Sequence, residues 1–132
     1  MELQIISIYR SQNWSSARLF EEIKKMLDHE KNTLIVGDFN ICFKENYSNQ
    51  LIQGLLKIGF VQLIHEPTHT RGRIIDHAYF RDHTKKLKID IDRHSPYYSD
   101  HDAFCIIIKR CTAVMEENED SKMIRKDKKL TI

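Results

Sequence analysis

Apolar positions in the first sixty residues follow two periods, which predict two strands and two helices. The short run "ELQIISIY" is rich in Ile and Leu, which is typical of a buried strand. "NWSSARLFEEIKKMLDHEK" predicts a helix, because its apolar side chains recur at the spacing of one helix face: Leu19, Phe20, Ile23, Met26 and Leu27. Ser15 or Ser16 is expected to cap this helix. "TLIVGDFN" then predicts a second strand that ends at a Gly-Asp turn.

The remaining pattern predicts one more helix and further strands. "NQLIQGLLKIGF" has helical spacing, with Gly59 as the left-handed residue after the helix, and the apolar run "FVQLIHE" stops at Pro67. "RIIDHAYF", "LKIDID" and "AFCIIIKR" predict three strands separated by polar loops. The expected fold class is α/β, a mixed and largely antiparallel sheet with helices on one face. Element order alone leaves open whether the first two strands are parallel or adjacent.

Composition divides the chain into a folded part and a charged end. Residues 1–111 are expected to form a single domain, and residues 112–132, which include "EENEDSKMIRKDKK", a flexible tail with few apolar side chains. The three cysteines have no metal-binding or disulfide pattern, which favours a reducing compartment. With no signal-like start and no membrane-length apolar run, we expect an intracellular protein, nuclear or cytoplasmic, without a membrane partner.

Acidic side chains end, interrupt or precede three of the predicted strands. Asp38 ends "LIVGD", Asp76 lies inside "RIIDHAYF", and Asp100 and His101 precede "AFCIII". Loops at one rim of a sheet can bring such groups together, and carboxylate oxygens suit Mg²⁺ or Mn²⁺. Each group also has a structural interpretation: "GDFN" is a good turn, and a lone histidine is usually a satisfied structural one.

Two further sets of side chains leave alternatives open. Arg71 and Arg73, near Asp76, could contact nucleic-acid phosphates or lie on an exposed turn, and the net charge of +2 permits such a partner without requiring it. His65 and His69 have no second pair of ligands at a fitting distance, so zinc is not favoured.

The ordered motifs "VGDFN", "RGRIIDHAYF" and "YYSDHDAF" resemble the three C-terminal signatures of the endonuclease/exonuclease/phosphatase family, whose members include deoxyribonuclease I. The likeness covers residues 3–110 and is nearest to the endonucleases of LINE-type retrotransposons. It implies a metal-dependent phosphodiesterase that acts on DNA or RNA, with Mg²⁺ or Mn²⁺ as cofactor.

The resemblance also implies roles for individual residues. Asp38 would activate the attacking water, and Asn40 would hold the water or the scissile phosphate. Asp76 would pair with the His101 imidazole, which would stabilise charge on the phosphate.

Three more assignments follow from the same resemblance. Asp100 would lie in the metal region, and Tyr9 would lie near the phosphate. Thr68 occupies the place of a family threonine, and its role is left open.

The family's complete domain is a four-layer α/β sandwich, and the resemblance matches its C-terminal half. The half that carries the principal metal-binding glutamate has no counterpart here. We therefore expect an apolar sheet face available for self-association or a partner chain. A catalytically silent remnant that only binds nucleic acid or protein is the alternative. A phosphatase of the same family has no specific support in these residues.

Overall fold

The computed structural model describes residues 2–69, 72–95 and 99–111. These residues divide into two compact units, the first spanning Met1–His83 and the second beginning at Thr84. Each unit has its own sheet, and each is described separately.

The sheet of the first unit is mixed. Strand β1 (Leu3–Tyr9) pairs in parallel with β2 (Asn32–Asp38), and β4 (Asp76–Arg81) pairs antiparallel with both β2 and the short β3 (Val61–Gln62). The strand order is β1-β2-β4-β3. The prediction of an α/β fold with a mixed sheet is confirmed, and the question of the first two strands is answered: they are parallel neighbours joined by a helix.

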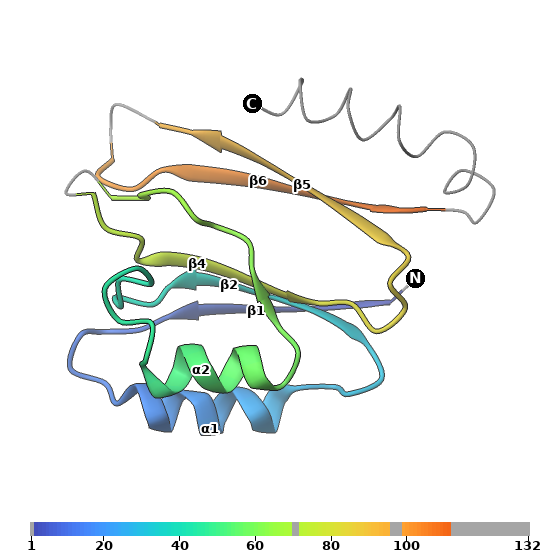
Figure 1. Cartoon of the computed structure of the whole chain (residues 1–132), viewed down its shortest axis with the longest axis horizontal. Coiled ribbons are helices and arrows are strands. Elements are labelled where there is room, and N and C mark those ends of the chain that lie inside the picture. Colours follow the sequence, from blue (N-terminus) through green and yellow to red (C-terminus); the bar gives the residue numbers. More distant parts are fainter. Residues whose placement is uncertain (1, 70–71, 96–98, 112–132) are drawn as a thin grey trace. The chain divides into compact units, whose positions relative to one another are not determined.

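Helices α1 (Ser16–Met26) and α2 (Gln50–Lys57) lie on one face of this sheet (Figure 1). The predicted cap of α1 is confirmed, because the Ser15 hydroxyl accepts the backbone N–H of Arg18 at 3.3 Å. The backbone of Gly59 is left-handed, with φ of 100°, and ends α2 as expected.

The core of the first unit lies between the helices and the sheet. It is formed by side chains from both helices, from β1, β2 and β4 and from the loops, including Ile6, Ile8, Ile23, Ile35, Phe39, Leu51, Leu55 and Tyr79. Two expectations about burial were wrong in part. Met26 is 47% exposed, because α1 ends there and Leu27, already extended, takes the last core position. Strand β1 is buried on one face only, so that Ile5 remains 62% exposed.

The second unit contains an antiparallel hairpin of β5 (Leu87–His94) and β6 (Ala103–Arg110). These two strands were expected to extend a single sheet. Among the described residues they pair only with each other, from Leu87 opposite Arg110 to His94 opposite Ala103. The predicted tail at 112–132 lies outside the described residues. No helix in the described part of the chain is long and apolar enough to cross a membrane.

Candidate functional site

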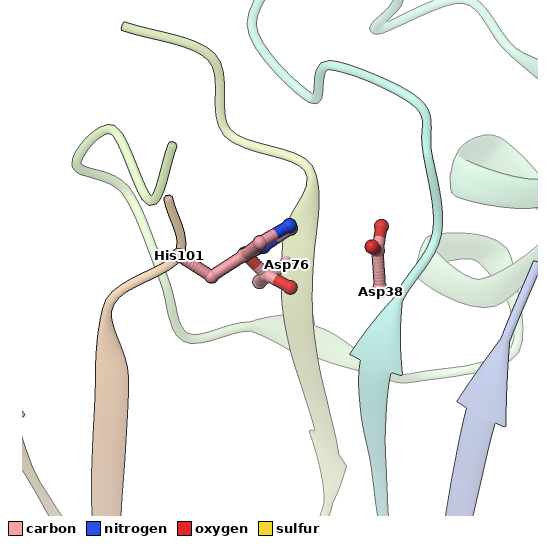
Figure 2. A group of neighbouring side chains, drawn as sticks. All are labelled: Asp38, Asp76 and His101. Carbon is pink, nitrogen blue, oxygen red and sulfur yellow. The ribbon is translucent and has the colours of Figure 1, made fainter. Parts of the chain in front are cut away.

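Three of the predicted site residues form a row across the sheet of the first unit. Tyr9 is the register partner of Asp38 on the neighbouring strand, and Asp38 is the register partner of Asp76. Because side chains alternate along a strand and Ile8, Gly37 and His77 are on the helix side, the row lies on the face away from the helices. Asp38 ends β2, and Asp76 begins β4 (Figure 2).

The carboxylates of Asp38 and Asp76 lie near each other. Asp38 and Asp76 each offer an oxygen, and these two oxygens lie within 4.8 Å of each other. Two ligands at about 2.1 Å from a Mg²⁺ ion are at most about 4.2 Å apart, so a shared ion would require the two oxygens to lie within that shorter distance. Both groups are half-buried, which leaves them reachable from solvent. The donor set therefore fits a hard divalent cation.

The turn after β2 is fixed by hydrogen bonds from Asn40 and Arg10. The Asn40 backbone N–H donates to Asp38 Oδ1 at 3.0 Å, and Asn40 adopts φ of 50°, which asparagine tolerates better than most residues. The Asn40 side-chain amide donates to the carbonyl of Arg10. In return, Arg10 Nη1 donates to the carbonyls of Phe39 and Asn40 at 3.1 and 3.4 Å. This exchange holds Asp38 in position.

Thr68 fixes the backbone that leads into Asp76. Its hydroxyl oxygen accepts the backbone N–H groups of Ile75 and Asp76 at 3.2 and 3.1 Å, and its side chain is 1% exposed. The Thr68 backbone N–H also donates to the carbonyl of Arg73 at 2.9 Å. A buried hydroxyl thus satisfies two amides that would otherwise have no acceptor there.

His77 connects the two segments beneath the carboxylates. Its Nε2 lies 2.8 Å from the Ile41 carbonyl and 3.0 Å from the Ile74 carbonyl, both of which can only accept, so Nε2 carries the proton. Burial lowers the His77 pKa, which favours a neutral ring whose Nδ1 accepts from the Tyr79 hydroxyl at 2.8 Å. The ring also stacks on Phe39 with centroids 4.8 Å apart. The turn that carries Asp38 and the segment that carries Asp76 are therefore tied to one side chain.

Of the remaining predicted residues, Asp100 and His101 belong to the second unit, and Arg73 belongs to the segment of the first unit that precedes β4. His101 is half-buried just before β6, and its backbone N–H donates to Ser99 Oγ at 3.1 Å, whereas Asp100 is exposed. Figure 2 draws His101 with Asp38 and Asp76. His101 belongs to the second unit, and its role is part of the proposal below. Arg73 is half-buried in the first unit, and Arg71 lies outside the described residues.

Sequence reasoning did not find the roles of Arg10, Thr68 and His77. Their hydrogen-bond partners are mainly backbone groups at positions 39–41 and 73–76, and no side-chain motif signals such contacts. A usable sign for His77 was its place on the apolar side of "RIIDHAYF", where a buried imidazole must find partners.

Comparison with protein-family models, with curated proteins and with solved structures returned no match.

Proposed function

We propose that the chain is a phosphodiesterase that uses a divalent metal ion, most simply a DNA endonuclease of the kind found in mobile elements. The observation that carries the proposal is the cross-strand pairing of Asp38 with Asp76. The two carboxylates lie on the sheet face away from the helices, where β2 ends and β4 begins. The resemblance assigns Asp100 to the metal region. Bound Mg²⁺ or Mn²⁺ would supply positive charge against the phosphate oxygens.

In this proposal Asp38 takes the proton of the attacking water. Its Oδ1 accepts the Asn40 N–H, which orients the carboxylate toward a substrate approaching from the face away from the helices. Asn40 thereby acts mainly by shaping this turn, and Tyr9, 75% exposed beside Asp38, is available to a phosphate.

The resemblance of "YYSDHDAF" to a family signature gives His101 a role in the proposal. An imidazole that donates to Asp76 through one nitrogen presents the other to the phosphate, and protonation there stabilises the charge that develops in the transition state. Arg71 and Arg73 would contact phosphates of the nucleic acid.

Nicking of supercoiled plasmid DNA by the purified chain tests this proposal. With Mg²⁺ we expect open circles to accumulate, EDTA to stop the reaction, and Asp38→Asn or Asp76→Asn to slow it by about 10² to 10⁴ fold. Asp92→Asn, which removes an exposed carboxylate on β5, is the matched control and should nick like the parent chain.

A folded parent chain that leaves the plasmid intact would contradict the proposal. The silent binding module would then be the better account. Equal nicking by the parent and by both site variants would also reject it, because the activity would come from elsewhere.

A further inference from the structure

An exposed tryptophan lies on the loop that joins β1 to α1, beside the proposed site. Trp14 is 64% exposed, and no hydrogen bond or ring contact of its indole is present among the described residues. An indole left in water costs free energy that burial would recover, so a ligand that covers it gains affinity. The fold itself makes no use of this ring.

The backbone of Trp14 is nevertheless tied to the turn that carries Asp38. Arg10 Nη2 donates to the Trp14 carbonyl at 2.6 Å, while Nη1 of the same guanidinium donates to the carbonyls of Phe39 and Asn40. Because the guanidinium is small, planar and rigid, the three carbonyl oxygens that it contacts lie close to one another. The Trp14 N–H also donates to the Ser11 carbonyl at 3.1 Å, which closes a turn. The ring is thus carried on an ordered loop next to the carboxylate end of the sheet.

The surroundings of Trp14 favour a stacked base over an apolar partner surface. Its neighbours along the chain from Ser11 to Ser15 are polar, so this stretch of the loop presents one aromatic ring among polar side chains. The first turn of α1 follows directly, contains no acidic residue and carries Arg18. A phosphate chain that passes this loop meets the positive end of a helix and a cation.

We propose that Trp14 is a stacking platform for an unpaired base of the nucleic acid whose phosphodiester is presented to Asp38 and Asp76. This inference rests on the proposed function, and it names the form of the substrate. Bases inside a duplex are covered by their neighbours, whereas an unpaired base offers its face to an indole. The preferred substrate is therefore single-stranded, frayed or nicked nucleic acid.

The fluorescence of Trp14 provides a direct test, because the chain contains one tryptophan. The whole chain is titrated in EDTA, which prevents cleavage, with a single-stranded oligothymidylate of about 12 nucleotides and with a duplex of equal length. We expect saturable quenching by the single strand and tighter binding of it than of the duplex. Fluorescence anisotropy of a labelled strand gives the affinity of variants that lack the indole.

Trp14→Ala is expected to weaken single-strand binding by about 5- to 150-fold, which corresponds to the usual range for one stacked base. Trp14→Phe should retain most of the affinity. Val61→Ala, which shortens a side chain 60% exposed on β3, is the matched control and should bind like the parent chain. Circular dichroism checks that each variant is folded.

Equal binding by Trp14→Ala and the parent chain would overturn the inference, as would binding without quenching or no binding of the single strand. The plasmid assay separates these results from failure of the proposed function. Stacking without any nicking would reject the nuclease and keep the platform. Nicking by the parent chain, together with unchanged single-strand binding by Trp14→Ala, would keep the nuclease and reject the platform.

Discussion

Thr68 shows how a single buried hydroxyl can position the backbone of a carboxylate residue in the proposed site. Thr68→Val keeps the shape of the side chain but removes the acceptor for the amides of Ile75 and Asp76. We expect the free energy of unfolding to fall by about 1–3 kcal/mol, because these buried donors lose their partner. Urea denaturation measures the change. Thr84→Val, at an exposed turn, is the control, and a Thr68 variant as stable as this control would contradict the role assigned to Thr68.

Tyr79 predicts how stability responds to alkaline pH. Burial raises its pKa above the usual value of 10.0, so the folded tyrosine keeps its proton while the unfolded one ionises. Its contribution to stability is complete below pH 10 and decreases as the pH rises above that value. Tyr79→Phe should cost about 1 kcal/mol near neutral pH, through loss of the bond to His77, and should lose less stability than the parent chain above pH 10.

Urea unfolding of both chains over this pH range gives the measurement. Tyr47→Phe, which alters a tyrosine that is 56% exposed, serves as the control and should follow the parent chain. An equally steep decline for Tyr79→Phe and the parent would show that the buried hydroxyl does not titrate as described.

At the level of elements, the parallel pairing of β1 with β2 depends on Gly37, which directly precedes Asp38. A Cβ atom at Gly37 would lie 1.7 Å from the carbonyl oxygen of Ile8, and its φ of 152° is rare for other residues. We expect Gly37→Ala to cost more than about 4 kcal/mol or to prevent folding, because the strands would have to separate. Gly72→Ala is the comparison, since its Cβ would meet nothing within 4 Å and only φ of 77° opposes it, at about 1–2 kcal/mol. Thermal unfolding with similar losses for both would contradict this account.

The spacing of apolar residues predicted the helices and strands well, but it predicted poorly which strands pair with one another. Ile23 and Leu55 recur at helical spacing and are buried as expected, and Gly59 ends α2 with the left-handed backbone that its position predicted. The separation of the β5-β6 hairpin from the first sheet could not be predicted, because which strands share a sheet depends on contacts between residues that are distant in the sequence.

The candidate site shows the same division between what sequence reveals and what it hides. Motif order drew attention to Asp38 and Asp76, and the structure makes them register partners. The roles of Thr68 and His77 could not be predicted, because these side chains bind backbone groups that only the fold brings near.

For the whole molecule, the distribution of the core predicts unequal stability of the two units. All residues of the main buried cluster belong to Met1–His83, whereas no residue of β5 or β6 is fully buried. Amide hydrogen exchange should therefore be slower in β2 and β4 than in β5 and β6, because a hairpin without buried side chains opens more easily. Equal protection of both sheets would show that the hairpin is held more firmly than its burial suggests.

The central claim of the proposed function is that Asp38 and Asp76, register partners on neighbouring strands, act as one catalytic group on a phosphodiester. The most direct measurement is the Mg²⁺-dependent plasmid-nicking rate of the parent chain, Asp38→Asn, Asp76→Asn and the double variant, each checked for folding. Groups that work as a unit are not additive, so we predict that the double variant is slower than the slower single variant by less than about tenfold. Losses that multiply in the double variant, or single variants that nick like the parent, would contradict the claim.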